Sequence, residues 1–200
     1  MLSRLSPYWL WILLSVPALG MTSVFLSADA CALHGLLHPT GEFAARFMII
    51  AMLATPLMYL TKGAAWARWL KANRRYFGVA AFGYGALHLY VYLVDKGSLD
   101  RVLTEASRFD MATGWLAMLI FVPLAATSMD SAVRALGRWW KPVQRLTYAA
   151  AVLTLLHWAS LNDWSGWAPA LVHFAPLGIL TAYRLWWLYL RPRPRPGAVA

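Results

Sequence analysis

Two histidines lie alone inside strongly apolar runs of the sequence. His88 is part of "GALHLYVYLVD", residues 85–95, and His157 is part of "AAAVLTLLHWASL", residues 149–161. A polar side chain is costly to bury in an apolar membrane segment, and where one occurs it commonly serves function. Neutral imidazole is a frequent ligand of transition metals and of haem iron. These residue types therefore predict iron or haem binding, provided that the fold brings the two side chains together.

The composition predicts that the fold is embedded in a membrane. Of the 200 residues, 60% are hydrophobic and 13% are charged, and the mean hydropathy is +0.53. Six apolar stretches approach the roughly 20 residues that a spanning helix needs. They are residues 8–27, 43–60, 77–94, 112–128, 146–161 and 167–188. We expect an all-α integral membrane protein, a six-transmembrane-helix bundle that forms a single domain over residues 1–200.

The basic residues predict the orientation of this bundle. Of the 18 lysines and arginines, 14 lie at the N-terminus, in alternate connections and at the C-terminal end, whereas seven of the eight acids lie on the opposite side. By the positive-inside rule both termini are cytoplasmic, with residues 190–200 as a cytoplasmic tail. The net charge of +10 is then a topology signal and gives no reason to propose nucleic-acid binding.

Counting along the helices predicts that the two histidines lie at one depth. His88 follows Phe77 by 11 residues and His157 follows Leu146 by 11 residues, on two stretches that run in the same direction. At about 1.5 Å per residue, both lie roughly 16 Å from the inner boundary. Two such imidazoles can bind a haem from opposite sides, which fills both axial positions and suits electron transfer. The alternative is that each histidine only hydrogen-bonds to a neighbouring helix.

Two further side chains are candidates near this depth. His173 lies six residues into the last stretch, which runs in the opposite direction, so it could replace either ligand or contact a haem propionate or a water. Arg46 enters the outer end of the second stretch, one turn after Glu42. We expect Arg46 to pair with Glu42, to reach the headgroups or to neutralise haem propionates.

The connection before the second stretch contains another pair of histidines. His34 and His38 are four residues apart, a spacing that on a helix would point both the same way. Gly35, Pro39 and Gly41 predict a loop here, which argues against a metal-binding pair.

Three longer segments carry a family resemblance. They read "HPTGEFAARFMIIAMLATPL", "RRYFGVAAFGYGALHLYVYLVDKG" and "GWLAMLIFVPLAATSMDSAVRALGRWWKPVQRLTYAAAVLTLLHW", and they lie within about residues 34–160. The most specific pieces are His-x-Thr-Gly at 38–41, Arg-Arg-x-x-Gly at 74–78 and Thr-Ser at 127–128. Together they resemble the MsrQ family, also called YedZ, in the ferric reductase-like transmembrane superfamily.

The resemblance implies a b-type cytochrome of the bacterial inner membrane. In that family the membrane subunit accepts electrons from quinol or a cytoplasmic flavin reductase. It passes them to MsrP, a periplasmic molybdopterin enzyme that reduces methionine sulfoxide in oxidised proteins. The subunit belongs to an oxidoreductase system but has no sulfoxide chemistry of its own. His88 and His157 match the family's haem-ligand positions.

The sequence departs from the family at the inner end of the fifth stretch. The family often has a histidine thirteen residues before the one matching His157, where this chain has Gln144, and the same spacing before His88 falls at Arg75. Glutamine is a poor iron ligand, so we expect one haem b in the outer half of the membrane and doubt a second. Electrons would then arrive through an inner flavin such as FMN, from quinol bound near the outer haem, or through a second haem held by other residues.

Two rival interpretations remain open at this point. A ferric reductase-like cytochrome with another periplasmic acceptor would use the same histidines and would also need a separate electron donor. A haem-free membrane scaffold or transporter would use them only as hydrogen-bonding groups.

Overall fold

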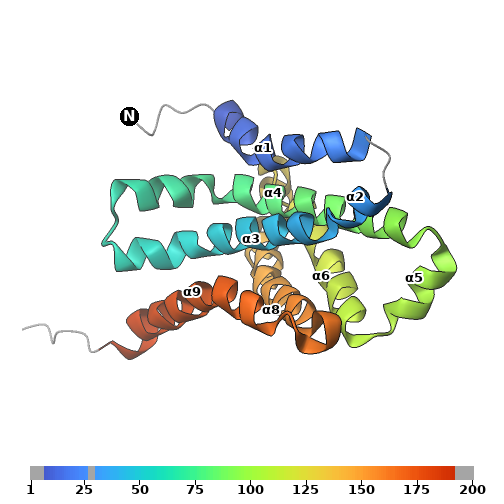
Figure 1. Ribbon diagram of the computed structural model, residues 1–200. Helices are drawn as coiled ribbons and strands as arrows, with labels where there is room; N and C mark the ends of the chain where they lie inside the picture. The colour runs from blue at the N-terminus through green and yellow to red at the C-terminus, as the bar shows by residue number, and fades with distance from the viewer. Residues whose placement is uncertain (1–6, 27–29, 192–200) are drawn as a thin grey trace, which may run out of the picture.

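The computed structural model describes residues 7–26 and 30–191, and the regular structure within them is helical (Figure 1). The expected end of the first stretch at residue 27, the first six residues and residues 192–200 of the expected tail lie outside the described residues. Long helices are α1 (Pro7–Leu26), α3 (Leu37–Leu60), α4 (Ala65–Lys96), α6 (Phe109–Ala126), α8 (Trp140–Trp164) and α9 (Trp167–Leu185). Short ones are α2 (Ala30–His34), α5 (Leu99–Ala106), α7 (Asp130–Leu136), η2 (Gly137–Trp139) and the π-helical turn η3 (Trp186–Leu190).

The long helices coincide with the apolar stretches expected from the sequence. Among the described residues, α1, α4, α6 and the segment Ala32–Leu60 that contains α3 are long and apolar enough to cross a membrane. The all-helical class and the membrane character of the fold are therefore confirmed. Membrane crossing by α8 and α9, and hence the count of six spans, stays a prediction.

The start of α3 corrects the sequence-based expectation of a loop. The helix begins at Leu37, so both Pro39 and Gly41 belong to its first turns. Proline is tolerated there because the first backbone N–H groups of a helix have no intrahelical partner. Gly41 has a different reason, which the site below supplies.

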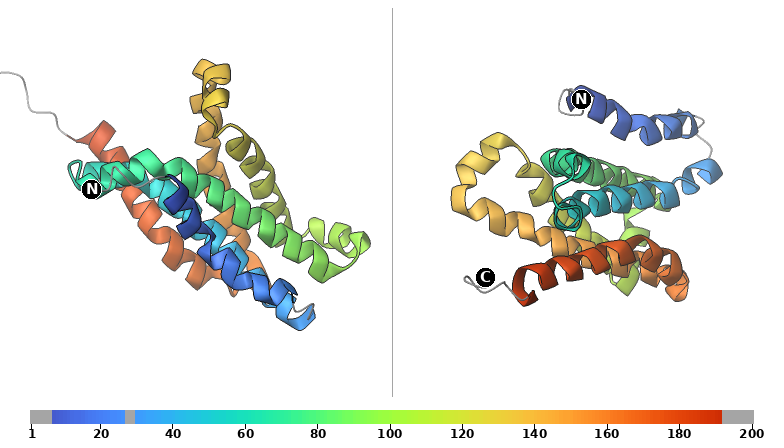
Figure 2. Two further views of the ribbon diagram at one scale, coloured as in Figure 1. Left: turned by 90° about the horizontal axis from the view of Figure 1, so that it is seen from above. Right: turned by 90° about the vertical axis from the view of Figure 1, so that its left-hand side faces the viewer.

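The bundle is built from two helix pairs. Helix α3 packs along α4, and α6 packs along α8, while α9 contacts both α3 and α8, and α1 lies against α4. Viewed from above, the α6–α8 pair diverges from the α3–α4 pair toward α7 and approaches it near α5 (Figure 2). The end of α4 and the beginning of α6 are thereby brought together.

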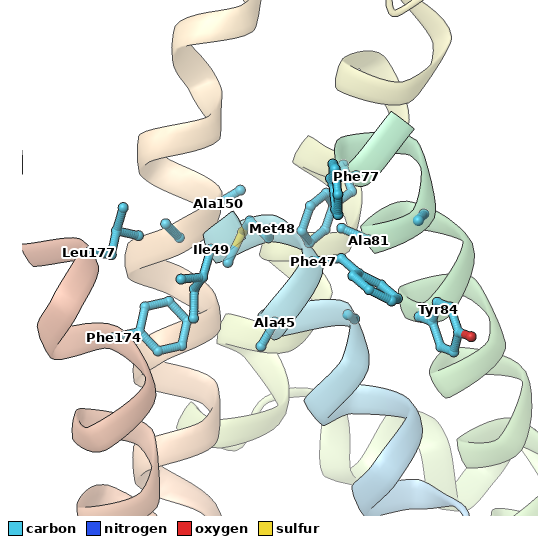
Figure 3. Packing of buried hydrophobic residues seen from close by; sticks show 14 of the residues in the cluster. Ala45, Phe47, Met48, Ile49, Phe77, Ala81, Tyr84, Ala150, Phe174 and Leu177 are labelled. Carbon is cyan, nitrogen blue, oxygen red and sulfur yellow. The ribbon is translucent and has the colours of Figure 1, made fainter. Parts of the chain in front are cut away.

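The core lies where α3 is enclosed by its neighbours (Figure 3). Phe47 of α3 packs against Phe77 and Tyr84 of α4, with ring centroids 6.4 and 5.3 Å apart, while Ile49 belongs to the same buried cluster as Phe174 of α9. Large apolar side chains also cover the outside, among them Ile12, Leu119, Val172 and Ile179, each more than half exposed. An apolar exterior of this extent is expected of a surface that contacts lipid.

A break in α8 sets the position of α9. The backbone leaves helical geometry at Leu161, and Asn162 and Asp163 adopt left-handed conformations with φ of 50° and 53°. Gly166 then passes so close to α8 that a Cβ atom there would lie 2.1 Å from the carbonyl oxygen of Trp158. Only glycine fits this crossing, which turns α9 back along α8.

Candidate functional site

The structure brings the rings of His88 of α4 and His157 of α8 close together in an edge-type arrangement. Their ring centroids are 6.2 Å apart and their planes are inclined by 76°. Both side chains are partly buried between the two helix pairs. The two lone histidines of the apolar runs therefore form one site.

Each of these rings is held by a backbone carbonyl at Nδ1. Nδ1 of His88 lies 2.9 Å from the oxygen of Leu37, and Nδ1 of His157 lies 2.6 Å from the oxygen of Asp110. A carbonyl oxygen can only accept a hydrogen bond, so Nδ1 carries the proton in both rings. The lone pair of each neutral ring is then on Nε2. Neither Nε2 atom has a hydrogen-bond partner among the described residues, so both are available to a metal.

The spacing of the rings fits one metal ion between them. An imidazole nitrogen binds a metal at about 2 Å, so two rings on opposite sides of one ion have centroids roughly 6 Å apart. Within the described part of the chain, no group of three or more His, Cys, Asp or Glu side chains could hold a metal ion. Two imidazoles alone do not complete a metal's coordination, whereas a porphyrin supplies the remaining four nitrogens. The donor set thus fits a haem better than a metal held by protein side chains only.

His173 lies in a polar cluster with Glu42 and Arg46, which we call the Glu42 cluster. Arg46 Nη2 is 2.5 Å from Glu42 Oε1, and His173 Nε2 is 3.3 Å from the same carboxylate oxygen and 3.4 Å from Arg46 Nε. Nδ1 of His173 is 2.8 Å from the carbonyl of Pro169, so it carries a proton. Nε2 therefore accepts from Arg46 in the neutral ring and donates to Glu42 in the charged ring. Unlike the Nε2 atoms of the other two histidines, this one already has partners.

The Glu42 cluster borders the histidine pair through Trp158. This indole follows His157 in the chain, contacts the ring of His173 in a tilted arrangement with centroids 4.8 Å apart, and meets the ring of His38 edge-on at 6.0 Å. His38 also lies 3.8 Å from Glu42, whereas His34 pairs with Asp95 at 2.8 Å. His34 and His38 thus contact different carboxylates.

Gln144 and Arg75 both make contacts within the protein. Gln144 Nε2 donates to Thr127 Oγ1 at 2.9 Å and to the carbonyl of Leu124 at 3.2 Å, which ties α8 to α6. Arg75 pairs with Asp130 at 2.5 Å and lies over the ring of Trp140. Neither position offers a free nitrogen donor resembling those of His88 and His157.

A cavity of about 300 Å³ lies elsewhere, between α1 and α4. Its lining is mainly apolar and includes Trp11, Ala80 and Leu87, with the Tyr84 side chain at one wall. The Tyr84 hydroxyl donates to the carbonyl of Leu14 and accepts from the N–H of Ala18. Since none of the five histidines lines this cavity, the candidate site rests on the paired imidazoles and not on the cavity.

Two glycines that the sequence analysis assigned to no function contact the imidazole rings. A Cβ atom on Gly41 would lie 3.1 Å from Nδ1 and Cε1 of His88, and one on Gly114 would lie 2.8 Å from Nδ1 of His157. The signal that could have found them is the Thr-Gly dipeptide, which the sequence contains at 40–41 and 113–114 only.

Comparison with known proteins identifies relatives of the whole chain. The family described as ferric reductase like transmembrane component matches residues 40–155. A protein of Ralstonia nicotianae named protein-methionine-sulfoxide reductase heme-binding subunit MsrQ is 33% identical over 199 residues, covering 95% of this chain and 88% of that protein. A protein of Brucella ovis with the same name is 34% identical over 172 residues, covering 82% of this chain and 75% of its own length. No solved structure matches the chain. Because the likeness extends over most of the length of these relatives, the chain belongs to the MsrQ family of ferric reductase-like transmembrane proteins.

Proposed function

We propose that this chain is the haem-bearing membrane subunit of a methionine sulfoxide reductase system. In this proposal it passes electrons across the bacterial inner membrane to a periplasmic molybdopterin reductase of the MsrP type. The observation that carries the proposal is the close pair of His88 and His157, each with Nδ1 bound to a carbonyl and Nε2 free. The relatives, which are named heme-binding subunits, support it.

His88 and His157 are the proposed axial ligands of one haem b. A haem supplies one-electron transfer when bound, and two imidazole ligands leave its iron no open position for a substrate. In this proposal the sulfoxide binds to a different subunit. This chain's own residues position the ligands and keep the surroundings apolar.

The proposed topology has six spans with both termini in the cytoplasm. At about 1.5 Å per residue, the regular part of α8 before its break, residues 140–160, and the 19 residues of α9 extend roughly 31 and 28 Å, comparable with a hydrocarbon core of about 30 Å. The basic connections on one side of the bundle support the orientation. His88 lies eight residues before the end of α4, and His157 lies four before the break at Leu161. Both are then close to the periplasmic face, where the acceptor docks.

A single haem per chain is favoured by the contacts at the inner end of the bundle. The amide of Gln144 is occupied by α6, and Arg75 by Asp130, so the two positions thirteen residues before the ligands serve packing and ion pairing. The electron donor is then quinol in the membrane or a cytoplasmic flavin reductase. The candidates to hold the phosphate of a flavin such as FMN are the basic residues of the inner connections, Arg74, Arg75, Arg138 and Lys141.

Arg46 and His173 are proposed to face the propionate edge of the haem. A propionate in a partly buried site needs a cationic or hydrogen-bonding partner. The Glu42 cluster lies beside Trp158, the residue after one proposed ligand, and it contains both an arginine and a histidine.

Absorbance of the purified protein tests the proposed ligands. We expect b-type Soret and α bands that His88→Ala and His157→Ala each remove, while His34→Ala, at an exposed histidine that pairs with Asp95, retains them as the histidine control. Pyridine haemochrome should give one haem per chain. Bands that persist in both ligand variants would overturn the ligand assignment. A protein without bands from haem-replete cells would favour a haem-free scaffold.

One rival function has a specific observation in its favour, namely the match to the ferric reductase like family. A cytochrome with that function would deliver electrons to ferric chelates. Stopped-flow reoxidation of the reduced protein separates the two functions. We expect rapid reoxidation by an MsrP-type enzyme with methionine sulfoxide, and slow reoxidation by ferric citrate.

A further inference from the structure

We propose that the two Thr-Gly dipeptides of the chain form matched binding motifs that fix the orientation of the two imidazole rings. Each motif comprises a carbonyl, a threonine three residues later and a glycine four residues later. One is Leu37, Thr40 and Gly41 on α3, and the other is Asp110, Thr113 and Gly114 on α6. The inference rests on the proposed function, in which these rings are iron ligands, and adds positioning residues to it.

The carbonyls of the two motifs make equivalent contacts. The oxygen of Leu37 accepts from Nδ1 of His88, and the oxygen of Asp110 accepts from Nδ1 of His157. Leu37 is the first residue of α3 and Asp110 is the second of α6, so both carbonyls belong to the first turn of a helix. In each case the helix with the motif packs most extensively on the helix with the histidine.

The glycines explain how the rings reach these carbonyls. A glycine four residues after a helical carbonyl leaves the space beside that oxygen open. In both motifs the imidazole fills this space, because a Cβ atom would come within 3.1 Å of His88 at Gly41 and within 2.8 Å of His157 at Gly114. Any side chain at these positions would push the ring, or its whole helix, away from the carbonyl.

The threonines contact the same carbonyls as the rings. Thr40 Oγ1 donates to the oxygens of Leu36 and Leu37 at 2.6 and 3.0 Å, and Thr113 Oγ1 donates to those of Phe109 and Asp110 at 2.9 and 2.8 Å. Both threonines are buried, with exposures of 0% and 5%. Threonine bonds of this kind tilt helical carbonyls and bend the helix slightly. Each motif thus fixes the oxygen to which a ring is bound.

The repetition argues that the motifs serve the ligands and not only helix packing. Small residues at helix contacts in membranes commonly serve close packing alone. Packing alone does not explain why the same three-residue pattern occurs on both α3 and α6. It also does not explain why the pattern on α3 contacts His88 and the one on α6 contacts His157. The second hydrogen bond of a metal-bound histidine sets its ring orientation and basicity, and its loss weakens metal binding about 10–100-fold in other proteins.

Substitution of the glycines tests the inference, with glycines in open space as controls. Gly41→Ala and Gly114→Ala place a methyl group against a ring, whereas Gly78→Ala on α4 and Gly178→Ala on α9 meet no atom within 4 Å. Alanine favours helices over glycine, so all four variants should fold, which thermal unfolding and gel filtration in detergent would verify. The readouts are haem retention, reduction potential and the EPR g-values of the ferric form, which report the relative orientation of the two imidazole planes.

We expect the control variants to match the unmodified protein. Gly114→Ala should retain haem about tenfold more weakly, and any remaining haem should have shifted g-values. Gly41→Ala, with the milder contact, should keep haem but shift its g-values and potential. If the glycine variants fold and keep unchanged haem retention, g-values and potential, the proposed motifs are wrong, while His88 and His157 can still be the ligands. The motifs are also wrong if the control variants change as much as Gly41→Ala and Gly114→Ala. An unmodified protein without haem would instead overturn the proposed function, and this inference with it.

Discussion

The carbonyl oxygen of Asp110 lies 2.6 Å from Nδ1 of His157, while the carboxylate of the same aspartate is held by Arg108. Arg108 Nε and Nη2 contact the two carboxylate oxygens at 3.2 and 2.7 Å, and the Asp110 side chain is only 7% exposed. One residue thus connects the first turn of α6 to a proposed iron ligand. The ion pair fixes the start of the helix, and the backbone of that turn holds the ring.

This connection predicts the effect of Asp110→Asn. The substitution keeps the size and the carbonyl but removes the charge that Arg108 binds and that favours a helix N-terminus. We expect the free energy of unfolding to fall by about 1 to 2 kcal/mol. The expected loss is kept this small because the Arg108 side chain is largely exposed, so that solvent screens the ion pair. Haem should be retained with a small shift in potential. Thermal unfolding with parallel redox titration checks both, and Asp100→Asn in α5 serves as the exposed control. A variant as stable as the unmodified protein would contradict the structural importance of the pair.

Arg46→Leu tests whether the Glu42 cluster acts on the haem. The substitution removes the cation beside Glu42, which leaves a carboxylate of 18% side-chain exposure with only histidine partners. Loss of a positive charge near the haem destabilises the reduced form, which carries one more electron than the oxidised form. The reduction potential should therefore fall by tens of millivolts, the order of magnitude for one charge at moderate distance and dielectric constant. Redox titration measures the fall, with Arg68→Leu near the start of α4 as the control. Full haem occupancy with an unchanged potential would exclude a propionate role for Arg46.

Gln144→Ala tests the number of haems. The substitution removes two hydrogen bonds to α6, and we expect a loss of about 1 kcal/mol in stability because interhelical bonds in membranes are individually weak. Haem content should stay at one per chain, since the side chain has no role in iron binding in our proposal. Pyridine haemochrome and thermal unfolding measure these quantities. A drop in the haem content of folded protein would mean that Gln144 helps to hold a haem after all.

The proximity of the histidines could be predicted from the sequence, whereas their binding partners could not. A helix rises by a fixed distance per residue, so equal counts along two helices of the same direction put His88 and His157 at one depth. The rotation of a helix about its axis is fixed by the contrast between its apolar and polar faces, and beyond their first turns α3 and α6 are apolar almost all round. The hydrophobic periodicity therefore could not predict which carbonyls and glycines of these helices would face the rings.

The misplaced loop before α3 has a related cause. Pro39 and Gly41 were interpreted as loop residues because both commonly interrupt helices, yet each has a second use at a helix start. Pro39 loses no hydrogen bond in the first turn. Gly41 makes room for a ring of α4 that lies 47 residues further along the chain. Only the tertiary contact distinguishes the two uses.

The contact between α4 and α5 predicts a pH dependence outside the membrane segments. Glu105 of α5 lies 2.6 Å from Lys96 Nζ and 3.3 Å from the hydroxyl of Tyr92. The hydrogen bond from Lys96 lowers the pKa of Glu105 below its ordinary value of 4.5. A lowered pKa in the folded state means that the contact stabilises fully above pH 4.5 and that this stabilisation is lost as pH falls through the lowered pKa.

Hydrogen exchange of the α5 amides should report this loss. We expect protection of Leu99–Ala106 to be constant near neutral pH and to decline in acid once the intrinsic exchange rate is corrected for. Glu105→Gln should remove the decline and leave α5 weakly protected at every pH, because a neutral amide cannot replace the charged partner of Lys96. Asp100→Asn, on the exposed face of the same helix, should keep the unmodified profile. If the decline persisted in Glu105→Gln, another group would have to control the docking of α5, and the Lys96 contact would not be what holds this helix against the end of α4.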